Sequence, residues 1–173
     1  MFDSGVYGEV LMYQKAIEQS SPNLPICYFG ISSGLKPNID CTNNELLDAC
    51  GTHVHSGTSC NSFMDQGKSF YNSLVVNFNP WKELRYQTTD EVGDAQFMHC
   101  VQTGEANYEK KVFIIHNLDG SRAACGQLLN LAASARMKRL YISWILVAFL
   151  APGVVLPFYF RFEKTKFCNF RKK

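Results

Sequence analysis

Two histidines separated by a single residue occupy the stretch CGTHVHSGTSC, residues 50–60. Side chains of a β-strand alternate between its two faces, so His53 and His55 point to one side and Val54 to the other. Two imidazoles on one face of a strand can chelate a transition metal. The spacing alone is a weak signal, because two ordinary half-exposed histidines also fit it. A metal site therefore requires further ligands from elsewhere in the chain.

A second stretch, KKVFIIHNLDGSRAACG at residues 110–126, contains another group of reactive side chains. Its apolar run predicts a strand with His116 at the end, and NLDGS predicts the turn that follows. Arg122 comes six residues after this histidine, and Cys125 comes three residues later. A fixed guanidinium beside a metal-binding imidazole would attract a small anion to the metal. An ordinary ion pair at the rim is the alternative role of Arg122.

Short strands must position these side chains, and the sequence predicts an all-β body. Most candidate segments alternate between apolar and polar residues or are short apolar runs, and Gly, Asn and Pro separate them. The segments are residues 6–14, 26–35, 50–55, 68–81, 85–97 (two strands joined across DEVGD) and 110–117. This punctuation is typical of a β-sandwich or β-barrel.

The order of these motifs resembles the copper–zinc superoxide dismutase family. The resemblance covers roughly residues 5–129. It rests on the first strand GVYGEVLMYQ, the GL turn, H-V-H, a cysteine soon after, and the closing H…D-G-x-R-x-A-C-G. The short HSGTSC turn is similar to a divergent branch that we associate with algae and other single-celled eukaryotes. The resemblance implies a Greek-key β-barrel of the superoxide dismutase type for residues 1–129.

The resemblance also implies roles for individual residues. His53, His55 and His116 match three copper ligands of the family, and three imidazole nitrogens suit copper. Arg122 matches the arginine that guides superoxide to the metal, which would make it the catalytic residue outside the ligand set.

Two disulfides are expected, one from the resemblance and one from the spacing of two cysteines. Cys60 and Cys125 match the intramolecular disulfide of the family, which would join the turn after H-V-H to the strand that carries the arginine. Cys41 and Cys50 flank a short loop, TNNELLDA, and are our second expected pair.

The chain also departs from the family pattern, because it contains only four histidines and none lies between residues 56 and 98. The family's bridging and zinc-binding histidines are therefore missing, and we expect a copper-only site with no zinc. Ser69 (or Lys68) stands where the bridging histidine would be. We interpret His99 as a structural residue. Asp119 either orients a ligand imidazole or forms a turn in LDGS.

The C-terminal part has a different character. Residues 140–160 are 21 residues without a charge, and a helix of that length spans roughly 31 Å, close to the ~30 Å hydrocarbon core of a bilayer. We expect one transmembrane helix there, kinked by Pro152 and Pro157, after a helical lead at residues 130–139. Residues 161–173 form a basic tail.

Charge and cysteine content indicate the topology and the compartment. The span is preceded by three basic residues and followed by six, which favours a cytoplasmic or stromal tail and a lumenal or extracellular N-terminal domain. Six of the seven cysteines lie before the span, as expected in an oxidising compartment. Residues 1–135 hold 8 Lys and Arg against 14 Asp and Glu, about −6, which argues against a nucleic-acid partner.

Two functions fit these observations. The first is a membrane-anchored superoxide-dismutase-like protein with weak or vestigial activity, for which superoxide is the substrate. The second is a non-catalytic structural subunit of a multi-protein membrane complex, with membrane lipids and other membrane-protein subunits as partners. For the host complex we expect a photosystem in the thylakoid membrane. Copper binding without turnover lies between the two, and an empty site is compatible with the second.

Overall fold

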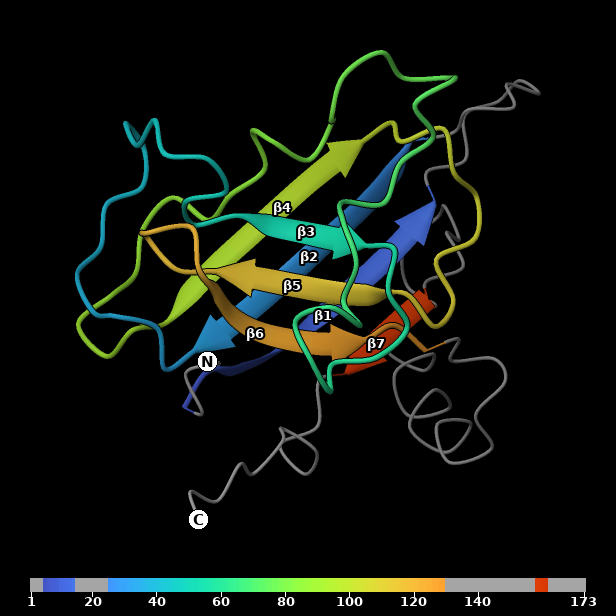
Figure 1. Cartoon of the computed structure of the whole chain (residues 1–173). Coiled ribbons are helices and arrows are strands. Elements are labelled where there is room, and N and C mark those ends of the chain that lie inside the picture. Colours follow the sequence, from blue (N-terminus) through green and yellow to red (C-terminus); the bar gives the residue numbers. More distant parts are fainter. Residues whose placement is uncertain (1–4, 15–24, 130–157, 162–173) are drawn as a thin grey trace, which may run out of the picture.

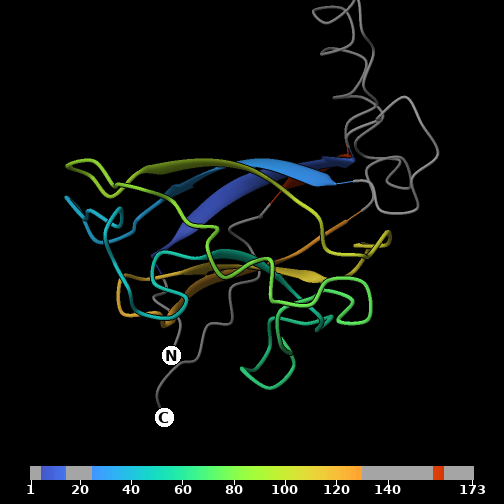
Figure 2. The same ribbon diagram turned by 90° about the horizontal axis from the view of Figure 1, so that it is seen from above.

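The computed structural model describes residues 5–14, 25–129 and 158–161 (Figure 1). These residues form β-strands and no helix: β1 Tyr7–Gln14, β2 Ile26–Ser33, β3 Thr52–His55, β4 Ala95–Val101, β5 Val112–His116, β6 Arg122–Gln127 and β7 Phe158–Arg161. Antiparallel pairing produces a sheet of order β4-β2-β1-β7 and a sheet of order β3-β5-β6. The two sheets form two layers (Figure 2). The expected all-β class is confirmed.

Aromatic side chains fill the space between the layers. Tyr28 of β2 is fully buried, and its ring centroid lies 5.4 Å from that of Phe113 in β5 and 6.1 Å from that of Trp81. The Tyr28 hydroxyl donates a hydrogen bond of 2.8 Å to the Thr52 carbonyl oxygen. The core therefore connects the larger sheet directly to β3, the strand that carries the two neighbouring histidines.

Strands β3 and β5 of the smaller sheet are buried on both faces. Every residue of β3 and β5 is buried. Val54 belongs to the core between the sheets, so alternation puts His53 and His55 on the opposite, outer face. The chain that follows β3 covers this face, where Cys60 packs against Val112 and Ile114. The same segment also pairs with the edge of β3, because Phe70 donates a backbone hydrogen bond of 2.8 Å to Val54. The histidines are thus enclosed although they face away from the main core.

Two strand predictions were wrong. Residues 68–81 contain only an isolated bridge, because the side-chain oxygens of Asn72 and Asn79 accept hydrogen bonds from the amides of Leu74 and Trp81 and turn the chain. In residues 85–97 only the second expected strand forms, as the start of β4. The first makes isolated bridges with the segment before β3, Asp40 to Thr88 and Gly51 to Arg85.

Three disulfides stabilise the described part. The expected pairs Cys60–Cys125 and Cys41–Cys50 are both present. The third, Cys27–Cys100, was not anticipated; it joins residues that face each other in the pairing of β2 with β4. The sequence does not reveal this partnership, because it depends on the register of two strands 73 positions apart.

Most of the C-terminal prediction lies outside the described residues, including residues 130–139, 140–157 and 162–173. Within the described part there is no helix of sufficient length and apolar character to cross a membrane. Residues 158–160, the end of the expected span, lie in β7, which pairs with β1. A single crossing between residues 140 and 157 would put β7 and β1 on opposite sides of the bilayer. The strand pairing and a single crossing therefore exclude each other.

Candidate metal centre

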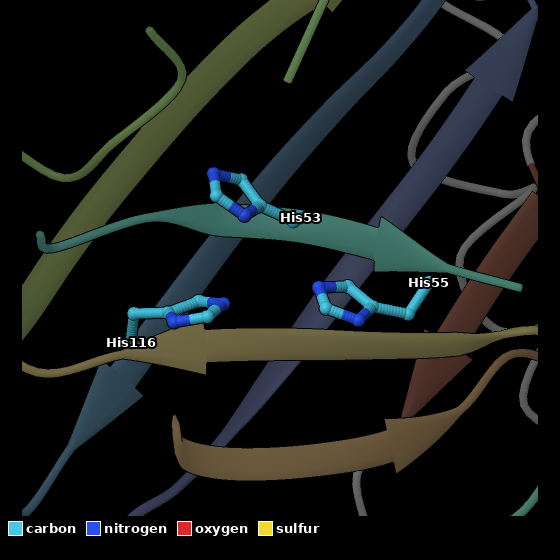
Figure 3. A group of neighbouring side chains, drawn as sticks. All are labelled: His53, His55 and His116. Carbon is cyan, nitrogen blue, oxygen red and sulfur yellow. The ribbon is translucent and has the colours of Figure 1, made fainter. Parts of the chain in front are cut away.

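Three histidines that are far apart in the sequence meet on the outer face of the smaller sheet (Figure 3). His53 and His55 extend from β3 and His116 from the end of β5, and all three are at most 5% exposed. One nitrogen from each ring can be chosen so that all lie within 4.8 Å of one another. The register of β3 with β5 brings the histidines together. His53 lies opposite Ile114, and His116 follows Ile114 by two residues, so both side chains are on the same face.

Backbone carbonyls fix the proton positions on two of these rings. Nδ1 of His55 lies 3.0 Å from the carbonyl oxygen of Gly67, and Nδ1 of His116 lies 2.8 Å from that of Gly120. A carbonyl oxygen only accepts, so each Nδ1 carries the hydrogen and each Nε2 keeps a free lone pair. Both Nε2 atoms are buried without a hydrogen-bond partner. Both glycines have positive φ, +69° and +77°, a conformation that glycine adopts readily.

His53 is held by close packing. An added Cβ at Gly51 would lie 2.6 Å from both Cε1 and Nε2 of His53, so this ring rests on the glycine backbone. Nδ1 of His53 lies 3.6 Å from Oδ1 of Asp48, beyond hydrogen-bond length. Neither nitrogen of this fully buried ring makes a hydrogen bond. Unpaired buried polar atoms are costly, so the ring's position calls for a ligand.

Burial keeps the three imidazoles neutral. It lowers the pKa of His55 to about 4, and the nearby Arg122 contributes to the decrease. Burial also lowers the pKa of His53 well below its usual value, and repulsion from the two neighbouring imidazoles adds to the effect. The pKa of His116 is lowered by burial as well. Neutral imidazoles are the form that binds metal ions.

Arg122 lies beside the histidines but is bound to the loop after β3. Nη1 donates to the Phe63 carbonyl at 3.0 Å and to Oε1 of Gln66 at 2.6 Å, and Nη2 donates to the Gly67 carbonyl at 3.0 Å. The guanidinium carbon also lies 3.9 Å from the ring centroid of Phe63. The Gly67 carbonyl thus accepts from both Arg122 and His55. This shared acceptor links the arginine to the face that carries the three histidines.

The remaining predicted residues lie as follows. Ser69 forms an isolated antiparallel bridge with His55, and directly opposed residues of such a pair place their side chains on the same face. His99 lies apart from the group, where its Nε2 is 2.9 Å from the Arg85 carbonyl oxygen, which fits a structural role. Oδ1 of Asp119 accepts hydrogen bonds from the amide and the hydroxyl of Ser121. Asp119 therefore forms the turn and does not orient an imidazole by a hydrogen bond.

The donor atoms fit a transition-metal ion. Metal–imidazole bonds of about 2.0–2.1 Å place neighbouring ligand nitrogens about 2.9–3.4 Å apart and opposite ones about 4 Å apart. Binding would therefore draw nitrogens that are 4.8 Å apart together by about 0.7–1.9 Å. The structure supplies lone pairs on neutral, buried nitrogens. A buried group of three histidines that could hold a metal ion is thus present, and its geometry leaves the metal's identity open.

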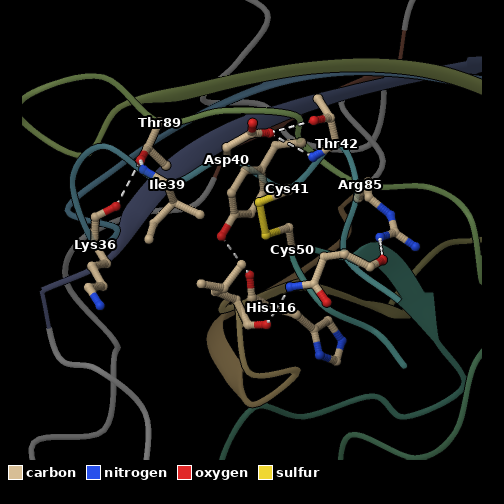
Figure 4. The surroundings of a disulfide bond; sticks show 12 residues. Lys36, Ile39, Asp40, Cys41, Thr42, Cys50, Arg85, Thr89 and His116 are labelled. Carbon is tan, nitrogen blue, oxygen red and sulfur yellow. Dashed lines mark hydrogen bonds between the residues drawn. A yellow bond between two sulfur atoms is a disulfide. The ribbon is translucent and has the colours of Figure 1, made fainter. Parts of the chain in front are cut away.

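Sequence reasoning missed the residues that support the site. The His53 ring packs against Gly51, and the carbonyl oxygens of Gly67 and Gly120 accept hydrogen bonds from His55 and His116. In the sequence these positions are marked only by a glycine close to a histidine or a turn. Asp48 was missed because it precedes H-V-H by five residues and approaches His53 only through the fold of the loop between Cys41 and Cys50. Figure 4 shows the disulfide that closes this loop, with His116 nearby.

No protein-family model matches this chain, and no curated protein shows significant sequence similarity to it. The site must therefore be interpreted from its own chemistry.

Proposed function

We propose that the described part is a superoxide-dismutase-like, Greek-key metal-binding domain whose three histidines hold a single copper ion. The observation that carries the proposal is the set of buried imidazoles whose free nitrogens converge. Three imidazoles suit copper, and the Irving–Williams order ranks Cu²⁺ above the other divalent first-row ions. The pairing of Ser69 with His55, beside the expected bridging position, is also consistent with the resemblance.

Bound copper would supply a one-electron couple that oxidises one superoxide to O₂ and reduces a second, with two protons, to H₂O₂. Arg122 is the group that would attract the anion, because its charge lies near His55 and His116. Its guanidinium is already engaged by three acceptors of the neighbouring loop. Guidance by a fixed charge remains available, whereas a new bidentate contact with superoxide would have to displace one of these hydrogen bonds.

Proton delivery limits the activity that we propose. The described residues place no fourth imidazole at the site, because His99 is bonded to the Arg85 carbonyl elsewhere. The hydroxyl of Ser69 is a poor proton donor, and it accepts a hydrogen bond of 3.2 Å from Asn79. Water must then supply both protons. We therefore propose weak or vestigial dismutation, far below that of a complete two-metal enzyme.

Titration with copper tests the proposal. Wild-type protein should bind one equivalent, and His53→Ala or His116→Ala should abolish tight binding. His99→Ala is the matched control, since it removes an imidazole that lies outside the group. Equal binding by all three variants would refute the assignment. Superoxide dismutation should be low for the copper-loaded protein and should fall further in Arg122→Ala, while copper binding is retained.

A structural role in a membrane complex is the second candidate. The missing bridging imidazole and the engaged Arg122 favour it, because both reduce catalytic capacity. The uncharged residues 140–157 support attachment to a membrane, although the pairing of β7 with β1 conflicts with a single crossing. Extraction of the full chain from membranes with carbonate tests attachment, and protease protection of a C-terminal tag tests the topology. Migration with a large complex on native gels would favour the structural role.

A further inference from the structure

The carboxylate of Asp48 lies beside His53 and outside the group of three histidines whose ligand atoms converge. To complete a site with that group, the carboxylate must move toward His55 and His116. We infer that Asp48 is a fourth ligand, so that the metal is held by three imidazoles and one carboxylate. The inference deepens the proposed function and rests on it.

The first argument is distance. Oδ1 of Asp48 lies 3.6 Å from Nδ1 of His53. With bonds of about 2.0–2.1 Å, neighbouring ligand atoms are about 2.9 Å apart in the tetragonal arrangement that Cu²⁺ prefers and about 3.3–3.4 Å apart in a tetrahedral one. The two atoms are within about 0.7 Å of either separation, and they are too far apart to be hydrogen-bonded to each other.

The second argument is which nitrogen of His53 binds the metal. Nε2 lies over the backbone of Gly51, where an added Cβ would approach it to 2.6 Å. In Figure 3, one ring nitrogen of His53 points toward His55 and His116. We assign this nitrogen as Nδ1, because Nε2 packs against Gly51. A carboxylate that only orients a ligand accepts the hydrogen of the nitrogen that does not bind metal. Asp48 approaches the opposite nitrogen, which is the position of a ligand.

The third argument is how the loop holds Asp48. The Cys41–Cys50 disulfide, whose cysteines are both fully buried, closes the loop, and Cys50 donates a backbone hydrogen bond of 2.9 Å to Asn117 beside His116. Asp48 has a φ of +60°, and its carbonyl accepts a hydrogen bond of 2.9 Å from Gly51. These contacts fix the backbone at Asp48, whose side chain lies beside His53 and is 31% exposed.

A carboxylate at this position has two chemical consequences. As a hard anionic donor it favours Cu²⁺ over Cu⁺, so it lowers the reduction potential of the bound copper. It also occupies the coordination position that a small anion would otherwise take. Asp48 thereby opposes the attraction that Arg122 exerts on such anions.

Two variants and one control test the inference. Asp48→Asn and Asp48→Gly remove the charge, and both residues tolerate positive φ, so the loop keeps its conformation. Glu45→Gln removes an exposed carboxylate from the same disulfide loop. Removing a group that only hydrogen-bonds to a metal ligand already lowers metal affinity about 10–100-fold. Both Asp48 variants should therefore bind Cu²⁺ at least about tenfold more weakly than the wild type. Glu45→Gln should bind as the wild type does.

Azide, a small anion, provides a second readout on copper-loaded protein. The azide-to-copper charge-transfer band should saturate at lower azide concentration in Asp48→Gly than in the wild type. The Cu²⁺ electron paramagnetic resonance spectrum should change in both Asp48 variants and stay unchanged in Glu45→Gln. Unchanged affinity and spectra in the Asp48 variants would overturn the inference and leave the three-histidine site intact. Failure of folded wild-type protein to bind copper would reject the proposed function and this inference with it.

Discussion

Replacing Gly51 with alanine perturbs the metal centre without touching a ligand atom. The added Cβ would lie 2.6 Å from Cε1 and Nε2 of His53 and 2.9 Å from the Asp48 carbonyl oxygen. Ordinary contact begins near 3.4 Å, so the ring or the backbone must move by about 0.8 Å. Overpacking of this kind costs about 1–3 kcal/mol of unfolding free energy. Because the displaced ring carries a ligand, we expect copper affinity to fall at least about tenfold as well.

Gly30→Ala is the matched control for this prediction. Its Cβ would lie 2.3 Å from the Phe97 ring in the main core, away from the histidines, so it should reduce stability by a similar amount and leave copper affinity unchanged. Urea denaturation measures the first quantity and copper titration with a competing chelator measures the second. If Gly51→Ala loses stability but binds copper as tightly as Gly30→Ala does, the packing of His53 against Gly51 does not position the ligand and the reasoning is refuted.

Three further predictions concern pH, a disulfide and the missing imidazole. Burial lowers the pKa of His55 to about 4 in the folded protein, so as the pH falls the imidazole is protonated in the unfolded chain before it is protonated in the folded one. Metal-free protein should therefore lose stability as the pH falls from about 6.5 to 4. A melting temperature that stays constant over that range would contradict this. Removing the Cys60–Cys125 disulfide by double substitution with serine should cost about 2–5 kcal/mol in urea denaturation, and a change below 1 kcal/mol would show that the bridge is dispensable. Ser69→His should increase copper affinity, because position 69 faces the same side as His55, and unchanged affinity would mean that this side chain does not reach the metal.

The sequence singled out the histidines that form the buried group because their signal is local. The alternation of a strand puts His53 and His55 on one face whatever the rest of the chain does, and the apolar run before His116 predicts a strand end. The meeting of His116 with the pair depends on the register of β3 with β5, which only the resemblance suggested. The expected strand at residues 68–81 failed because asparagine side chains bind the backbone and form turns, a competition that an apolar run does not reveal.

Other features depended on strand register and on the closure of a loop. The Cys27–Cys100 disulfide follows from the pairing of β2 with β4, and the approach of Asp48 to His53 follows from the closure of the disulfide loop. Neither has a signature in residue spacing. The same holds for Arg122, whose type was informative but whose three hydrogen bonds to the loop after β3 were not predictable from the sequence.

Metal analysis of the purified full-length protein tests the central claim most directly. The protein should be stripped of metal, exposed to equal concentrations of copper and zinc, freed of unbound ions and analysed by plasma mass spectrometry. The three buried histidines predict about one copper per chain and no zinc, with the copper lost in His53→Ala and His116→Ala. Stoichiometric zinc that copper does not displace, or no bound metal in the folded wild-type protein, would contradict the claim.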